Sequence, residues 1–183
     1  THFSIVDAAG NAVAMTSSVE NVFGSRLMAG GFILNNQLTD FSFRPSIKGS
    51  SVANQVEPGK RPRSSMSPTL IFDGAGQLRY ILGSPGGSRI IAYVTRTIIG
   101  LVDWKLNPQQ AVSLPHHVNR NGVTELEVDT TLPGLKASLE TMGHSVKVRP
   151  LVSGLHAIEI TPDGLKGGAD PRREGVAVGK QWQ

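Results

Sequence analysis

The 183 residues of this chain suffice for one domain with its own hydrophobic core, and 39% hydrophobic against 17% charged residues indicates a globular rather than a disordered chain. The absence of cysteine excludes disulfides, thiolate metal sites and a cysteine nucleophile. The formal net charge is +4, but only 5% of the residues are aromatic and no apolar run is long enough to cross a bilayer, so we expect neither a nucleic-acid partner nor a membrane span.

The first half of the chain reads as short strands. Residues 2–7 and 12–18 are rich in Val, Ile, Thr and Ser, and the AAGN between them contains Gly and Asn, which tolerate positive φ, so this part predicts a hairpin. Further strands are expected at GFILNN, residues 31–36, and at the pair SPTLIFD and QLRYILGS, which flank Gly74-Ala75-Gly76.

The period then changes to that of helices. Apolar residues recur at helical spacing between Ser88 and Asp103. A second helix is expected to begin after Asn107 as its cap, with Pro108 in the first turn. A third is expected in LPGLKASLETMGH, residues 132–144, with Gly143 as its C-terminal stop.

Strand patterns return at the end of the chain, in HSVKVRP, LHAIEITPDG and EGVAVGK, the last of these being residues 174–180. The segment FRPSIKGSSVANQVEPGKRP, residues 43–62, is the longest stretch without a predicted element, and loops of that length are usually functional or mobile. We therefore expect a single layered α+β domain over residues 1–183.

The first residue is a threonine rather than the methionine of a nascent chain, so we expect the chain to have been cut from a precursor. An N-terminal threonine can serve as a nucleophile, because its own α-amino group, with an ordinary pKa of about 8, accepts the hydroxyl proton. Thr1 is therefore a candidate nucleophile. The alternative interpretation is that Thr1 is merely the boundary of the sequence.

Such a nucleophile needs donors for the oxyanion that develops on the attacked carbonyl. The motif GSPGGSRI supplies three glycines, Gly83, Gly86 and Gly87, for a tight turn whose backbone N–H groups gather at the start of a helix. The motif lacks the Lys followed by Ser or Thr of a phosphate-binding P-loop.

Two other motifs suit the charges of an amino acid. NNQLTD follows an apolar strand and brings amide and acid side chains between Asn35 and Asp40, which suit an ammonium group. RPRSSMSPT places Ser64 and Ser65 before another strand, and hydroxyl and backbone N–H groups suit a carboxylate. Together these motifs predict a site for an amino acid.

The motifs THFSIVD, NNQLTDFS, KRPRSSMSPT, GSPGGSRI and ADPR, in this order, resemble the small subunit of γ-glutamyltransferase (γ-glutamyltranspeptidase), an N-terminal nucleophile hydrolase. The resemblance covers essentially the whole chain. It implies a layered αββα sandwich that is completed by a large subunit from the same precursor, and self-cleavage before a threonine. It also implies transfer of γ-glutamyl groups, from amides such as glutathione, to water or an amino acid, without a metal or another cofactor.

The resemblance assigns roles to residues of this chain, and an arginine of the large subunit normally completes the carboxylate site. The residues carried over are Thr1 as nucleophile, Ser18 as the hydroxyl that supports it, Glu20, Gln37 and Asp40 at the substrate α-amino group, Ser64 and Ser65 at its α-carboxylate, and Gly86 and Gly87 in the oxyanion hole.

The chain departs from the family pattern in two places. Members usually begin Thr-x-His, whereas here His2 follows Thr1 directly. If His2 keeps its register, Thr1 falls on the second position and the nucleophile is a residue before it, which matters because a slip of one residue exchanges the faces of a strand. The loop from Phe43 to Gly59 lacks the tyrosine that some members place over the substrate, so a lid is not expected.

Other interpretations of the same residues remain. Asp40 can cap a turn, Ser64 and Ser65 can bind loop amides, and Glu20 can be a solvated strand residue. The adjacent His116 and His117 face opposite ways on a strand and make a poor metal pair.

Other functions remain as well. The alternatives are a glutaryl-cephalosporin acylase of the same fold and a catalytically silent binding homologue. Arg172 and Arg173 after Asp170 and Pro171 indicate a turn with ion pairing, placed at a subunit boundary. The lack of cysteine suits a periplasmic or secreted protein.

Overall fold

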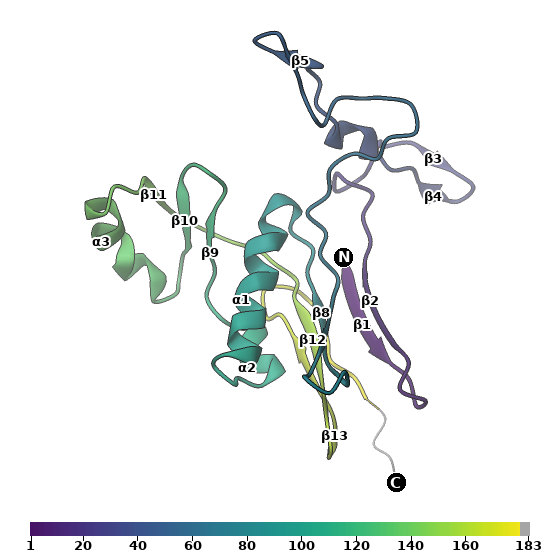
Figure 1. Cartoon of the computed structure of the whole chain (residues 1–183), viewed down its shortest axis with the longest axis vertical. Coiled ribbons are helices and arrows are strands. Elements are labelled where there is room, and N and C mark those ends of the chain that lie inside the picture. The colour runs from purple at the N-terminus through teal and green to yellow at the C-terminus, as the bar shows by residue number, and fades with distance from the viewer. Residues whose placement is uncertain (180–183) are drawn as a thin grey trace. The chain divides into compact units, whose positions relative to one another are not determined.

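The computed structural model describes residues 1–179 and divides the chain into two compact units (Figure 1). Unit 1 comprises Thr1–Thr16 and the chain from Ser65 onward, and unit 2 comprises Ser17–Ser64. The expectation of one domain over residues 1–183 stays a prediction.

The centre of unit 1 is a four-stranded antiparallel sheet in the order β13-β12-β8-β7. Its strands are β7 (Thr69–Phe72), β8 (Leu78–Gly83), β12 (His156–Thr161) and β13 (Gly164–Ala169). The predicted pair around Gly74-Ala75-Gly76 is confirmed as the β7-β8 hairpin. Its turn is held by Asp73, whose carboxylate accepts hydrogen bonds from the backbone N–H groups of Ala75 and Gln77, both at 2.9 Å.

The predicted N-terminal hairpin is also confirmed, as β1 (His2–Val6) and β2 (Ala12–Thr16). This hairpin packs closely against the central sheet. The ring of His2 on β1 occupies the space that a side chain on Gly83 of β8 would need. Figure 1 shows helices α1 and α2 on the other side of β8 and β12. Unit 1 therefore stacks a helical layer, a four-stranded sheet and a hairpin.

Helix α1 (Ile90–Val102) and helix α2 (Pro108–Val112) confirm two of the predicted helices. Asn107 caps α2 as expected, since its side chain accepts a hydrogen bond from the backbone N–H of Gln110 at 2.9 Å. The apolar face of α1 packs into the core of the unit. The fully or nearly fully buried members of this core are Leu82, Ile90, Tyr93, Val94, Leu101, Ala111, Val112, Val118, Leu151, Leu155 and Ala157.

A second sheet of unit 1 has the order β11-β10-β9. It consists of β9 (His117–Asn119), β10 (Thr124–Glu127) and β11 (Val146–Arg149). The predicted third helix lies between β10 and β11 as the short helix η3 (Leu132–Leu135) and α3 (Lys136–Thr141). The expected strand in HSVKVRP is β11, whereas β10, with two glutamates among four residues, gave no apolar signal in the sequence.

The prediction of a strand at residues 174–180 is wrong for residues 174–179, which belong to no strand. Residue 180 lies outside the described residues. Among the described residues the last strand is instead β13, which the sequence did not indicate because it is rich in glycine. Glycine is needed here because α2 approaches closely: a Cβ at Gly168 would lie 2.5 Å from the carbonyl carbon of Pro108.

Unit 2 is built from short elements. They are β3 (Met28–Ala29), β4 (Phe32–Ile33), the 3₁₀ helix η1 (Gln37–Asp40), β5 (Ser46–Ile47) and β6 (Ser50–Ser51). The strand expected at residues 31–36 is thus only two residues long, and the stretch expected to lack structure contains the β5-β6 hairpin. Among the helices of the described residues, none is long and apolar enough to cross a membrane.

The ADPR motif lies in a buried ion-pair network of unit 1. Arg172 donates two hydrogen bonds to the Glu127 carboxylate, at 2.5 and 2.8 Å, and one to Asp170 at 3.1 Å. It also donates to the carbonyl of Leu114 at 3.0 Å. The expected ion pairing of Arg172 is therefore confirmed, and it ties the end of the chain to β10.

His116 and Ser153 extend this network into the core. The hydroxyl of Ser153 donates to Asp170, so Nε2 of His116, 2.6 Å from that hydroxyl, carries the proton of the neutral ring. Nδ1 of His116 is buried without a hydrogen-bond partner. Burial, together with the charge of Arg172, lowers the pKa of His116 to about 4.

This histidine makes stability depend on pH. Between about pH 6.5 and about pH 4 the unfolded chain binds a proton that native His116 rejects, so stability falls as the pH falls through this window. The contribution lost is about 3 kcal/mol at most. We expect His116→Gln to flatten the pH dependence of the melting temperature of the complete protein over this window. An equal slope in wild type and His116→Gln would contradict this.

Candidate functional site

The candidate site residues are divided between the two units. Unit 2 carries the proposed α-amino ligands and the first serine of the pair, and unit 1 carries the second serine and the glycine turn. The members in unit 1 are Thr1, Ser65, Gly86 and Gly87, and those in unit 2 are Ser18, Glu20, Gln37, Asp40 and Ser64. The structure defines the geometry within each set.

The start of β1 is fixed by His2, which is only 3% exposed. Its Nδ1 lies 2.8 Å and its Nε2 3.2 Å from the hydroxyl oxygens of Thr16 and Ser4. Burial, nearby His156 and the α-amino group lower the pKa of His2 to about 4, so its ring is neutral near pH 7. Burial and the charge of Arg173 likewise lower the pKa of the Thr1 α-amino group, which favours the free amine.

The glycine turn follows directly from β8 and leads through the 3₁₀ helix η2 (Gly87–Arg89) into α1. Gly86 has a φ of 142°, and a Cβ there would lie 2.8 Å from the ring of Tyr93, so glycine is required both by conformation and by space. Gly87 has a φ of 58°. Backbone N–H groups here lie at the positive end of α1, as an oxyanion site requires.

Glu125 anchors this turn and was missed by the sequence analysis. It accepts hydrogen bonds from Nε and from the terminal nitrogen of Arg89, at 2.6 and 2.8 Å, and from Arg149 at 3.2 Å. Arg120 lies 3.8 Å from the same carboxylate and donates to the Ser88 hydroxyl at 2.7 Å. No motif could indicate this, because the partners come from separate parts of the chain.

The acid and amide side chains of unit 2 form two hydrogen-bonded pairs. The amide of Asn36 donates to the carboxylate of Glu20 at 2.5 Å, and that of Gln37 donates to Asp40 at 2.7 Å. The Glu20 carboxylate is thus bound at Asn36, the residue before η1, and η1 carries Gln37 and Asp40. The assignment of Glu20, Gln37 and Asp40 to an α-amino site stays a prediction. The sequence does not indicate the contact of Asn36 with Glu20, because the two residues lie 16 positions apart.

Local turns place Ser18 and Glu20. The Ser18 hydroxyl accepts a hydrogen bond from the backbone N–H of Glu20 at 2.8 Å, and Glu20 has a φ of 70°. The backbone N–H of Asn21 donates to the Asn36 side chain at 3.0 Å. A non-glycine residue at positive φ is uncommon, so the surrounding hydrogen bonds hold Glu20 toward η1 at some conformational cost.

The segment that enters the serine pair is held by a residue that the sequence analysis did not select. The side chain of Asn54 accepts a hydrogen bond from the backbone N–H of Arg63 at 3.0 Å and donates to the carbonyl of Asp40 at 2.7 Å. Ser64 is exposed and Ser65 is partly exposed, as binding to a ligand requires.

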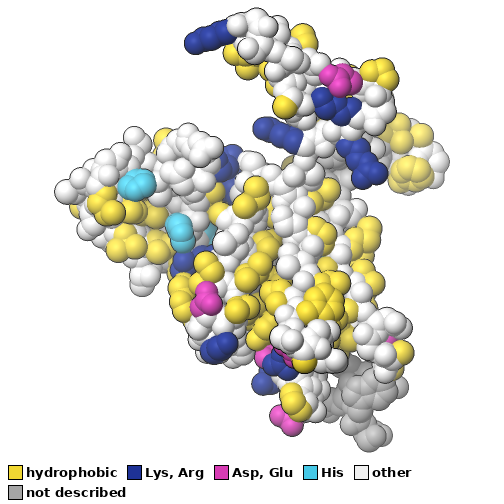
Figure 2. Space-filling view, viewed as in Figure 1, with side chains coloured by type: hydrophobic (Ala, Val, Ile, Leu, Met, Phe, Trp, Pro, Cys, Tyr) yellow, Lys and Arg dark blue, Asp and Glu magenta, His cyan; other side chains and the backbone are white. Residues whose placement is uncertain are grey.

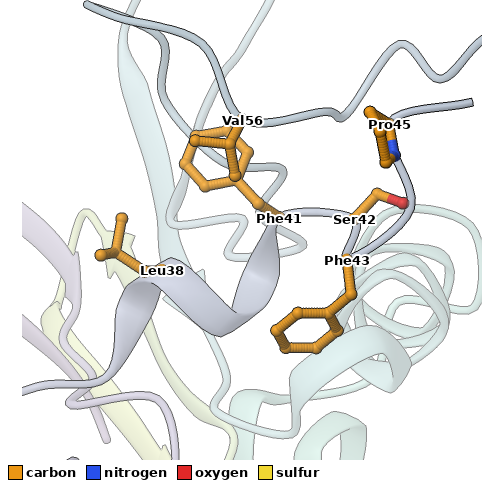
Figure 3. A pocket seen from close by; sticks show the side chains of 6 residues that line it. All are labelled: Leu38, Phe41, Ser42, Phe43, Pro45 and Val56. Atoms are coloured by element: carbon orange, nitrogen blue, oxygen red, sulfur yellow. The ribbon is translucent and has the colours of Figure 1, made fainter.

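An apolar hollow of about 440 Å³ lies beside η1 in unit 2. Figure 3 shows the side chains that line it, which are Leu38, Phe41, Ser42, Phe43, Pro45 and Val56. Phe41 directly follows Asp40 and is 6% exposed, so its burial fixes the end of η1. The polar side chains of η1, Gln37 and Asp40, are therefore held beside a small cluster of apolar side chains.

Unit 2 also carries excess positive charge, which favours anionic ligands. Figure 2 shows Lys and Arg side chains gathered on it. Its basic residues are Arg26, Arg44, Lys48, Lys60, Arg61 and Arg63, against Glu20, Asp40 and Glu57. Within residues 1–179, no group of three or more His, Asp or Glu side chains is arranged to hold a metal ion.

The chain is similar to known proteins over almost its whole length. The chain is 39% identical to a glutathione hydrolase proenzyme of Escherichia coli over 94% of this chain and 31% of that protein. It is 34% identical to an acylase ACY 1 proenzyme of a Pseudomonas species, over 97% of this chain and 31% of that protein. Among solved structures, a mutant γ-glutamyltranspeptidase of Helicobacter pylori matches with a TM-score of 0.83 and 34% identity, over 94% of this chain and 100% of that chain.

These similarities confirm the α+β fold of the N-terminal nucleophile hydrolase class. The model of the gamma-glutamyltranspeptidase family matches residues 1–180. The chain belongs to the γ-glutamyltranspeptidase family. It spans about a third of the length of the curated relatives that it matches.

The anchoring of the glycine turn gives a testable consequence for stability. Glu125→Gln removes the charge that binds three arginines and is expected to destabilise the complete protein by about 1.5–3 kcal/mol, as for the loss of charged hydrogen bonds. Glu140→Gln is the matched control, since Glu140 forms an exposed helical pair with Lys136 and should change stability by less than about 0.5 kcal/mol. Denaturant unfolding measures both. Equal stabilities of the two variants would contradict the anchoring role.

Proposed function

We propose that this chain, together with a large subunit from the same precursor, forms an enzyme that hydrolyses γ-glutamyl amides such as glutathione and transfers their γ-glutamyl group to amino acids. The observation that carries the proposal is the pairing of Glu20 with Asn36 and of Gln37 with Asp40 at η1 in a chain of this family. Carboxylates there suit the substrate ammonium group, and the relatives named glutathione hydrolase proenzymes support the choice of substrate.

The proposed reaction proceeds in two acyl transfers. The hydroxyl of the N-terminal threonine attacks the γ-carbonyl carbon of the substrate, and its proton passes to the α-amino group of the same threonine. That proton is then donated to the leaving amine as the C–N bond breaks. The backbone N–H groups of Gly86 and Gly87 stabilise the oxyanion, and the Ser18 hydroxyl supports the nucleophile. Water or an amino acid then attacks the acyl-enzyme and releases the threonine hydroxyl.

Two alignments assign the nucleophile. In the first it is Thr1, and the lowered pKa of its α-amino group supports the role of that amine as the base. In the second it is the residue before Thr1. Side chains alternate along a strand, so the residue before Thr1 would lie on the same face as His2. His2 lies against Gly83, the residue of β8 from which the chain enters the glycine turn. This observation favours the second alignment.

Replacing the N-terminal threonine of the mature subunit by alanine is expected to abolish both self-cleavage and turnover, because one hydroxyl serves both. N-terminal sequencing and the intact mass of the subunit first establish whether that residue is Thr1 or its predecessor. Thr141→Ala, on α3, should leave both activities intact. Substantial turnover without the N-terminal hydroxyl would refute the covalent mechanism.

The compartment belongs to the same proposal. We place the enzyme in the periplasm or outside the cell, supported by the lack of cysteine in the sequence. Fractionation of cells that express the complete precursor tests this placement.

A glutaryl acylase is the second candidate, favoured by the similarity to the acylase ACY 1 proenzyme. Glutaryl groups lack the α-amine, so Glu20 and Asp40 would face a ligand without a positive charge, at a cost in binding. A silent binding homologue is the third candidate, and it would form no acyl-enzyme.

The preference for γ-glutamyl over glutaryl anilides tests the α-amino site. In wild type the γ-glutamyl anilide should react far better, and Asp40→Ala should reduce the ratio of the two kcat/KM values by about one to two powers of ten, since a charged hydrogen bond contributes about 1.5–3 kcal/mol. Ser64→Ala acts on the carboxylate that both substrates share and should leave the ratio nearly unchanged. If the wild-type enzyme has a higher kcat/KM for the glutaryl anilide than for the γ-glutamyl anilide, the acylase function is favoured.

A further inference from the structure

One side chain in unit 2 joins the two proposed substrate-binding segments. The amide of Asn54 donates a hydrogen bond through Nδ2 to the backbone carbonyl of Asp40 at 2.7 Å. Its Oδ1 accepts a hydrogen bond from the backbone N–H of Arg63 at 3.0 Å. The backbone carbonyl of Asn54 also accepts from the N–H of Ser42 at 2.9 Å.

These contacts connect residues of different proposed roles. Asp40 belongs to the α-amino site, and Arg63 directly precedes Ser64 of the α-carboxylate site. The ammonium and carboxylate groups of a γ-glutamyl substrate are bonded to the same carbon, so their protein ligands must be held at one fixed spacing. Asn54 forms hydrogen bonds to the backbone of Asp40 and to that of Arg63, the residue before Ser64, and so connects the two backbone segments that carry these protein ligands.

The surroundings show that the Asn54 segment is docked onto the η1 end rather than free. Ser42 and Gln55 form a parallel β-bridge, and Val56 lines the same apolar hollow as Phe41. Asn54 is itself partly buried between these contacts. An asparagine suits this position because its amide supplies one donor and one acceptor in a fixed plane.

We propose that Asn54 is a positioning residue that sets the spacing between the ammonium and carboxylate subsites and thereby makes the enzyme select substrates with both charges on one carbon. This inference rests on the proposed function, in which Asp40 and Ser64 bind the two charges. Asn54 acts through the backbone at Asp40 and Arg63 and does not itself touch the substrate.

The proposal predicts an effect that depends on the number of substrate charges. A γ-glutamyl anilide must meet both subsites at once, whereas a glutaryl anilide, without the ammonium group, and a 4-aminobutyryl anilide, without the carboxylate, can each shift to fit one. Asn54→Ala removes two neutral hydrogen bonds, so we expect kcat/KM for the γ-glutamyl anilide to fall about tenfold to a hundredfold. The two single-charge anilides should fall less than about threefold.

The experiment compares the three anilides in the mature two-subunit enzyme, with rates normalised to the acyl-enzyme formed per subunit. Asn54→Asp keeps an acceptor for Arg63 but places an oxygen against the Asp40 carbonyl, so it should show the same selective loss, and it replaces Asn54→Ala should that variant not accumulate. Asn119→Ala is the matched control. Asn119 clamps the β9-β10 turn by donating to Gly122 and Thr124, at 3.0 and 2.8 Å, and its loss should leave the substrate ratios unchanged.

The outcomes separate this inference from the function on which it rests. A selective loss for the γ-glutamyl anilide in the Asn54 variants supports the positioning role. An equal loss for all three anilides, in an enzyme whose wild type prefers the γ-glutamyl anilide, overturns the positioning role alone. A wild type that accepts all three anilides equally well overturns the proposed function and this inference with it.

Discussion

The close approach of His2 on β1 to Gly83 on β8 is the constraint on which the start of β1 and the glycine turn after β8 depend. A side chain at position 83 would occupy the space of the imidazole ring, so glycine lets the N-terminal hairpin pack directly onto the central sheet. Gly83 is also the last residue of β8, from which the chain turns into Gly86 and Gly87. One contact thus fixes both the start of β1 and the strand end from which the glycine turn begins.

The interior of each unit is stabilised by different forces. Unit 1 has a core of buried aliphatic and aromatic side chains, supplemented by carboxylates that are paired with arginines. Unit 2 relies on hydrogen bonds from Asn36, Gln37 and Asn54, with Phe41 as its buried apolar anchor. Polar hydrogen bonds are directional, which suits a unit whose proposed task is to place a few ligands at fixed positions.

Sequence reasoning succeeded where the signal was local. The β1-β2 and β7-β8 hairpins, the course of α1 and the Asn107 cap follow from turn residues, apolar periodicity and capping chemistry within a few positions. It failed at β13, whose glycines resemble a loop until the backbone of α2 is seen against Gly168. Sequence reasoning also failed at β10, because Glu125 and Glu127 resemble surface residues in the sequence. In the fold they are buried and paired with Arg89 and Arg172, which come from distant segments.

The sequence by itself determined the family, the order of its motifs and the residue types of the candidate site, because these depend only on which side chains occur and at what spacing. Only the tertiary structure revealed that Asn54 joins Asp40 to Arg63, that Glu125 anchors the glycine turn and that His116 is buried neutral beside Ser153. Those roles arise from contacts between residues far apart in the chain. Such contacts leave no pattern in a single sequence, since each partner is an ordinary polar residue until the fold removes it from water.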